Sequence, residues 1–205
     1  WLAAALVAAS AVGLVTLADE WSRERIAANE RARLVARLQS VLDPTLLGRD
    51  VRIVAVEISD SAPLQSEALV NAFVALVDGR PTATVLANVA PYGYNGPIDL
   101  LVGIDDRGTV TGARAIRHRE TPGLGATIDA DDGAWFRQFA GKTLTDPPTE
   151  TWTVKQDDGA FDALSGATVT SRTVTAALRN ALLYFAQHRD ELYDAALAAP
   201  PDDRS

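Results

Sequence analysis

The chain has 205 residues, a formal net charge of −8 and no cysteine. This length allows one core of ordinary size beside an apolar leader, and the negative charge argues against nucleic acid or anionic lipid as the main partner. Without cysteine there can be no disulfide, iron–sulfur cluster or thiol nucleophile, and His118 and His188 lie too far apart to predict a metal site. Redox chemistry would therefore require a bound organic cofactor or a metal site without thiolates.

The chain opens on an apolar segment. Residues 1–18 carry no charge, and Asp19 and Glu20 end the apolar run. Its length is close to the roughly 20 residues that cross a bilayer as a helix. A secretory signal peptide would have a shorter apolar region, about 7 to 15 residues long, followed by a small-residue cleavage site. We therefore predict an uncleaved, single-pass transmembrane helix over 1–19.

An amphipathic neck helix is expected to follow over 20–45. Its apolar residues recur at a helical period, with Arg and Glu between them: Ile26, Leu34, Val35, Leu38 and Leu42. Pro44 and Gly48 end this pattern. The acidic residues after the apolar segment contribute little to the positive-inside rule, so the residues alone leave the membrane orientation open.

A single domain is predicted over 46–190. Alternating or apolar runs bounded by turn residues indicate short strands, most of them paired as hairpins. These strands are expected at 54–58, 72–77, 82–89, 98–104, 110–116 and 152–154. Helices are expected at 132–139 and 172–188, and hairpins with segregated helices define an α+β fold. Residues 191–205 are expected to form a partly disordered tail, because the last of them are prolines and polar residues.

A dense run of hydroxyl and small side chains precedes the last predicted helix: Asp162-Ala163-Leu164-Ser165-Gly166-Ala167-Thr168-Val169-Thr170-Ser171. One explanation is helix capping, with Thr170 or Ser171 as the N-cap residue. The other is an anion site, because the N–H groups and dipole of a helix N-terminus stabilise a phosphate, and Gly166 and Ala167 permit close backbone approach. A hydroxyl beside such a phosphate can be esterified to it.

A second motif is His118-Arg119-Glu120-Thr121-Pro122-Gly123-Leu124-Gly125. Taken alone, it predicts a Pro-Gly turn between a strand and a helix. The last helix is predicted to contribute only core residues, because its apolar side chains fall on one face.

Both motifs resemble those of one protein family. The run ending at Thr168 is similar to the Asp-x-x-Ser-Gly-Ala-Thr motif read by the flavin transferase that attaches FMN, taken from FAD, to protein threonine. The turn resembles the Glu-Thr-Pro-Gly-Leu-Gly signature of the G subunit of the Rnf ion-translocating electron-transport complex. Segments 94–98 and 135–142 also resemble this family in the same order, so the resemblance covers nearly the whole chain.

The resemblance implies an FMN-binding domain in which FMN is linked covalently, as a phosphoester, to Thr168. It implies phosphate surroundings at Ser165, Gly166, Ala167 and Thr170, and isoalloxazine contacts at Glu120, Thr121, Leu124 and Gly125. Asp162 would serve recognition by the transferase, or it would act only as a turn carboxylate. No catalytic residue is expected.

The resemblance also implies a role. The chain would be a redox subunit that carries electrons in an ion-translocating ferredoxin:NAD oxidoreductase complex, without independent turnover. Its partners would be the other membrane and peripheral Rnf subunits and, for maturation, the flavin transferase. Family members place this domain on the periplasmic side of the cytoplasmic (inner) membrane. The coupling ion and the direction of electron flow stay open.

Two alternatives stay open at this stage. The related C subunit of the sodium-pumping NADH:quinone oxidoreductase shares the acceptor threonine and the Pro-Gly turn. The second alternative belongs to a different functional class: a flavin-free, membrane-anchored scaffold module, in which the two motifs act only as a turn and a cap.

Overall fold

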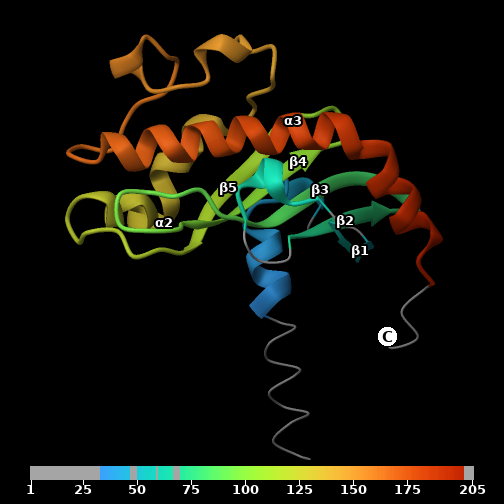
Figure 1. The fold of residues 1–205 in the computed structure, drawn as a ribbon. Helices are drawn as coiled ribbons and strands as arrows, with labels where there is room; N and C mark the ends of the chain where they lie inside the picture. The colour runs from blue at the N-terminus through green and yellow to red at the C-terminus, as the bar shows by residue number, and fades with distance from the viewer. Residues whose placement is uncertain (1–32, 47–49, 59, 67–69, 201–205) are drawn as a thin grey trace, which may run out of the picture. The chain divides into compact units, whose positions relative to one another are not determined.

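A computed structural model of the chain describes residues 33–46, 50–58, 60–66 and 70–200 (Figure 1). The chain divides into two compact units, Trp1–Arg37 and Leu38–Ser205. The predicted transmembrane helix over 1–19 and most of the predicted neck lie outside the described residues. Within the described residues, no helix has both the length and the apolar character needed to cross a bilayer.

In the described part of the second unit, five strands form one antiparallel sheet in which each strand pairs with the next. The strands are β1 (Val51–Glu57), β2 (Asn71–Val77), β3 (Arg80–Val89), β4 (Asp99–Asp105) and β5 (Val110–Arg117). β2 and β3 are joined by Asp78 and Gly79, whose φ values of 51° and 74° suit the tight turn that matches strand twist. Both predicted hairpins, 72–89 and 98–116, are therefore confirmed.

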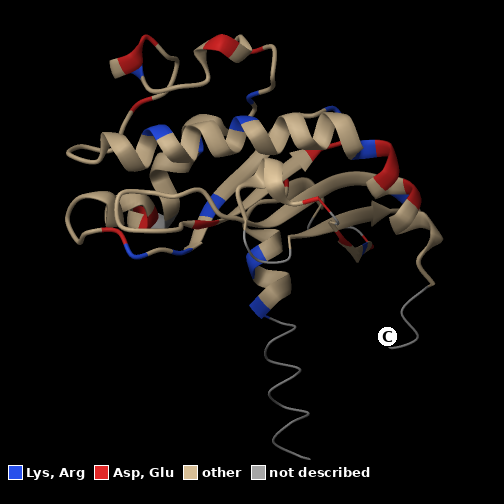
Figure 2. Cartoon of the chain, viewed as in Figure 1, with Lys and Arg blue, Asp and Glu red and all other residues tan. Residues whose placement is uncertain are grey.

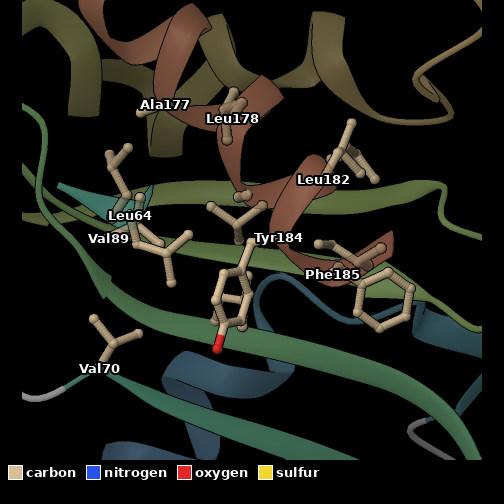
Figure 3. Close-up of a cluster of buried hydrophobic side chains, with 14 of the residues drawn as sticks. Leu64, Val70, Val89, Ala177, Leu178, Leu182, Tyr184 and Phe185 are labelled. Carbon is tan, nitrogen blue, oxygen red and sulfur yellow. The ribbon is translucent and has the colours of Figure 1, made fainter. Parts of the chain in front are cut away.

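The long helix α3 (Thr168–Ala198) covers one face of the sheet (Figure 1). Side chains along a strand point alternately to opposite faces, and β2 shows this directly. Val74 and Leu76 join the core beneath α3, whereas Ala75 joins a smaller apolar cluster. Figure 3 shows residues of α3, among them Leu178 and Phe185, in the larger core.

The predicted strand at 152–154 is wrong. This segment contains two short 3-10 turns, η5 (Thr149–Thr151) and η6 (Lys155–Asp157), and its only described pairing is an isolated bridge between Val154 and Phe161. Trp152 and Val154 are 1% and 0% exposed. Their alternation therefore reflects side chains of a loop that enter the core, not pairing within the sheet.

The helix predicted over 132–139 is interrupted. Helix α2 (Ala130–Gly133) ends at Gly133, which has φ of 73°, and a 3-10 helix, η4 (Ala134–Phe139), continues the chain. A left-handed glycine ends one helix and redirects the next. The break allows Phe136 and Phe139 to be buried, at 2% and 0% exposure.

The domain is longer than predicted at both ends. Its compact unit begins at Leu38, before the expected boundary at 46, and Leu38 and Val41 are each 1% exposed. Helix is present over 33–39 and stops before 45, and a short 3-10 turn, η1 (Pro44–Leu46), follows. At the other end α3 continues past 190 to Ala198, because Leu192 and Ala196 still pack in the core.

Candidate functional site

A surface cavity of about 460 Å³ lies at the N-terminus of α3. This volume falls within the roughly 300 to 1,000 Å³ typical of small-molecule sites. Three segments that are distant in sequence line it: Tyr94; Glu120, Thr121, Leu124 and Gly125; and Gly166, Ala167, Thr168, Val169 and Thr170. The fold therefore brings the two sequence motifs together. Of the predicted site residues, only Ser165 lies outside the lining.

Glu120 connects the three segments. Glu120 is only 6% exposed. Its Oε1 accepts a hydrogen bond from the backbone N–H of Asn95 at 2.8 Å, and its Oε2 accepts one from the hydroxyl of Thr170. A buried carboxylate needs such donors to offset the loss of water. The carboxylate thereby links the loop that bears Tyr94 to the first turn of α3.

His118 contacts the backbone of Glu120. Its Nδ1 lies 3.3 Å from the backbone nitrogen of Glu120, and its Nε2 lies 3.2 Å from Oδ2 of Asp129. Because a backbone N–H can only donate, Nδ1 is the acceptor and the neutral ring carries its proton on Nε2. The ring thus fixes the main chain at Glu120 against η3 (Gly125–Asp129).

Two glycines keep the cavity open. A Cβ at Gly125 would lie 2.3 Å from Oε2 of Glu120 and 3.0 Å from Oγ1 of Thr170. At Gly166, which has φ of 71°, a Cβ would lie 2.8 Å from Cδ2 of Leu124. Larger residues at either position would displace the walls of the cavity. The bare backbone therefore permits a ligand to approach closely.

The hydroxyls around the first turn of α3 are not equivalent. Those of Ser171 and Thr173 each donate to a backbone carbonyl of the preceding turn at 2.9 Å, and that of Thr170 donates to Glu120. The Thr168 hydroxyl makes no hydrogen bond to any described residue, and Thr168 lines the cavity. Ser165 is exposed but does not line it. Thr168 alone among these residues offers an unengaged hydroxyl to the cavity.

The N-terminus of α3 is favourable for an anion. The N-cap residue is Ala167, which has no side-chain oxygen, and the first turn contains no acidic residue. The first N–H groups of a helix have no partner within it, and the helix dipole adds positive potential there. The expectation that Thr170 or Ser171 caps the helix is wrong, because both residues lie inside α3 and their hydroxyls bond elsewhere.

Charge is sparse along most of α3 and gathers toward its C-terminal end (Figure 2). Near its start, Arg172 donates to both carboxylate oxygens of Asp157 at 2.5 and 2.8 Å. These hydrogen bonds lower the pKa of Asp157 and raise that of Arg172. The pair ties η6 to the first turns of α3.

Two lining residues, Tyr94 and Val169, were not assigned to the site from sequence. They are 74% and 46% exposed, and Leu124 is 45% exposed, so three large apolar surfaces surround the cavity mouth. The turn Asn95-Gly96-Pro97 beside Tyr94 was the available signal. In the described part of the chain, no group of three or more His, Cys, Asp or Glu residues could hold a metal ion.

Comparison with known proteins points to the same region of the chain as the cavity. A family model described as the FMN-binding domain matches residues 93–183, which include every lining residue. A relative from Vibrio vulnificus (strain YJ016) is 36% identical over 196 residues, covering 96% of this chain and 92% of that protein. A relative from Shewanella oneidensis is 33% identical over 193 residues, covering 94% and 91%. Each of these relatives is named as the G subunit of an ion-translocating oxidoreductase complex.

Proposed function

Because this chain belongs to the family of G subunits of ion-translocating oxidoreductase complexes, we propose that it is a membrane-anchored electron carrier of such a complex. We further propose that FMN is linked through its phosphate to Thr168. One observation carries this proposal: the Thr168 hydroxyl, without a hydrogen-bond partner among the described residues, shares one cavity with the Glu120 to Gly125 turn.

The phosphate would lie at the N-terminus of α3. Backbone N–H groups at the start of a helix bind phosphate well, and no acidic residue in the first turn of α3 opposes the charge. Gly166, Ala167 and Thr170 would surround it. Ser165 is better assigned to the outer surface, since it does not line the cavity.

The flavin ring would lie against the other two segments. Leu124 and Val169 offer exposed aliphatic surface, and Tyr94 offers an exposed aromatic face. Thr121, Gly125 and Glu120 provide the polar side of the same cavity. A planar, largely apolar ring with one polar edge suits this combination. When bound, FMN supplies the capacity to accept and donate electrons, and the protein supplies its orientation and electrostatic surroundings.

A covalent bond would keep the carrier loaded where no pool of free flavin can replace a lost molecule. We propose that this place is the periplasmic side of the inner membrane, with a single anchor over 1–19. Electrons would arrive from and leave to other subunits of the complex, without independent turnover by this chain.

The first experiment compares the wild-type chain with Thr168→Ala after expression of each with a flavin transferase. Intact mass and in-gel flavin fluorescence under denaturing conditions are measured. The proposal expects one phosphoester-linked FMN on the wild type and none on the variant. An unmodified, colourless wild type would instead favour the flavin-free scaffold. If the Thr168→Ala variant still carried FMN, the attachment would be at another hydroxyl.

A further inference from the structure

The loop that leads to Thr168 is held at its start by two side chains from η4. The backbone N–H of Asp162 donates to Oε1 of Gln138 at 2.7 Å. The Asp162 carbonyl accepts from Nε2 of Gln138 at 3.2 Å and from Nε1 of Trp135 at 2.8 Å. Gln138 thus engages both backbone groups of one residue, and Trp135 adds a third hydrogen bond. We call these two residues the loop clamp.

The same loop is held at its other end by α3. The backbone N–H of Leu164 donates to Oγ of Ser171 at 2.8 Å, and that of Ala167 donates to the Leu164 carbonyl at 3.0 Å. Residues 162–167 therefore run between two fixed points. Such restraint lowers the conformational freedom of the loop before any partner binds.

The clamp packs against a cluster of aromatic side chains. The Trp135 ring packs edge-on against Phe136 and Phe139, with ring centroids 5.3 and 5.1 Å apart. Phe161, the residue before Asp162, is 2% exposed, and its ring lies 4.5 Å from that of Phe139. The aromatic cluster thus positions both the clamp and the chain that enters the loop.

The side chains that the loop presents are exposed. The Asp162 carboxylate is 70% exposed, and its only described ion pair is with Lys155, which is 58% exposed and 2.8 Å away. Ser165 and Gly166 are exposed as well. An ion pair this exposed is weak, so a partner can replace Lys155 at little cost. Asp162 and Ser165 are therefore the polar residues of the motif that a partner can reach from outside.

We propose that Gln138 and Trp135 are positioning residues that hold the loop of the folded domain in the conformation bound by the flavin transferase. This inference rests on the proposed attachment of FMN to Thr168. In that step Oγ1 of Thr168 would attack the FMN-side phosphorus of FAD and form a phosphoester. The phosphoanhydride bond would break, AMP would leave, and the hydroxyl proton would pass to solvent.

The effect of the clamp on the loop can be measured separately from its effect on the stability of the domain. All three of its hydrogen bonds lie at exposed positions, so water can replace them if a side chain is removed. Losing them costs the fold little but frees the loop. A partner that binds the ordered loop must then restrict it again, which weakens binding. The effect should appear in the flavinylation reaction more than in the unfolding transition.

The test uses the full-length chain in detergent with purified transferase and FAD. Trp135→Phe removes the N–H donor and keeps a smaller aromatic ring in the cluster, whereas Gln138→Leu removes both of that residue's hydrogen bonds. Gln187→Leu, an exposed position on α3 outside the cavity lining, is the matched control. Initial rates of FMN incorporation are measured against chain concentration, beside thermal unfolding and hydrogen exchange of the amides at 162–167.

Each clamp variant should lower kcat/KM for FMN incorporation by about threefold to tenfold, mainly through KM, since a net hydrogen bond is worth that factor. In the clamp variants, hydrogen exchange of the amides at 162–167 should be faster, and the unfolding midpoint should be nearly unchanged. The Gln187→Leu control should match the wild type in all three measurements. Wild-type kcat/KM in folded Trp135→Phe and Gln138→Leu would overturn the clamp while leaving Thr168 attachment intact. A wild-type chain that takes up no FMN would overturn the proposed function itself, and the clamp with it.

Discussion

The carboxylate of Glu120 accepts a hydrogen bond from the hydroxyl of Thr170, 50 residues later in the chain. This contact joins the Pro-Gly turn to the first turn of α3 and closes one side of the cavity. It also engages the hydroxyl that lies nearest in sequence to Thr168 among the lining residues. The same hydrogen bond therefore shapes the cavity. Among the described residues in the first turn of α3, it leaves Thr168 as the only one whose hydroxyl lines the cavity without a hydrogen bond.

Glu120→Ala should destabilise the domain. The substitution leaves the buried hydroxyl of Thr170 without its acceptor, which costs roughly 1 to 3 kcal/mol. It also removes the part-buried hydrogen bond from the N–H of Asn95, worth about 0.5 to 1.5 kcal/mol. We expect a total loss of about 2 to 4 kcal/mol in the free energy of unfolding. Urea unfolding of the purified chain, followed by far-ultraviolet circular dichroism, measures it.

The matched control is Glu191→Ala, which removes an exposed carboxylate from α3. A surface change of this kind should stay within about 0.5 kcal/mol. If Glu120→Ala proved no more costly than the control, the contact with Thr170 would not contribute to holding the site together.

Gly125→Ala should damage the cavity more than Gly123→Ala. A Cβ at Gly125 would overlap Oε2 of Glu120, whereas a Cβ at Gly123 would meet nothing within 4 Å. Gly123 has φ of 77°, so alanine there costs only the roughly 1 to 2 kcal/mol of left-handed backbone. Flavin incorporation, measured by fluorescence, should fall in Gly125→Ala and persist in Gly123→Ala. Equal incorporation would mean that Glu120 can move aside.

The sequence alone predicted the hairpins of the sheet and singled out the two motifs. The hairpins at 72–89 and 98–116 followed from apolar runs and turn residues, because their pairing is local. Bringing the motifs near 120 and 168 into one site depended on family resemblance, since no local pattern reveals a contact across 50 residues.

Other features could not be predicted from local pattern. Trp152 and Val154 alternate like a strand, yet they lie in a loop whose side chains enter the aromatic core. The end of α3 was placed too early because Leu192 and Ala196 are buried through contacts with the sheet, which a helix-only pattern does not show. The loop that bears Tyr94 is held at the cavity in part by the hydrogen bond from the N–H of Asn95 to Glu120, a contact between residues 25 positions apart.

Gly103→Ala should be strongly destabilising. Gly103 and Gly112 are cross-strand partners on β4 and β5, and the backbone of Val41 crosses them. A Cβ at Gly103 would lie 2.2 Å from the Val41 carbonyl oxygen, which also accepts a hydrogen bond from the Thr111 hydroxyl at 2.6 Å. Overpacking of this kind costs about 1 to 3 kcal/mol or more.

Gly112→Ala provides the graded comparison, because its Cβ would lie 3.0 Å from the Val41 Cα, a smaller overlap. Thermal unfolding of both variants should show the larger drop in Tm for Gly103→Ala. The reverse order would contradict the close approach of Val41 to β4.

Tyr193 should make the domain less stable at high pH. Burial raises the pKa of Tyr193 to about 12, from the ordinary 10.0, although the nearby Thr84 hydroxyl opposes the rise. The folded state then keeps the phenol proton after the unfolded state has lost it. Between pH 10.0 and about 12 the unfolded state binds fewer protons, so the free energy of unfolding falls as pH rises.

Tyr193→Phe should remove most of this slope while leaving stability near neutral pH unchanged or slightly higher. In the described part of the chain, neither the Tyr193 hydroxyl nor that of Thr84 has a partner with hydrogen-bond geometry, so deleting the phenol oxygen breaks no bond. A smaller slope should remain from Tyr184, whose pKa is also raised by burial. Urea midpoints measured from neutral to alkaline pH check this, and an unchanged slope in Tyr193→Phe would show that Tyr193 is not the group responsible.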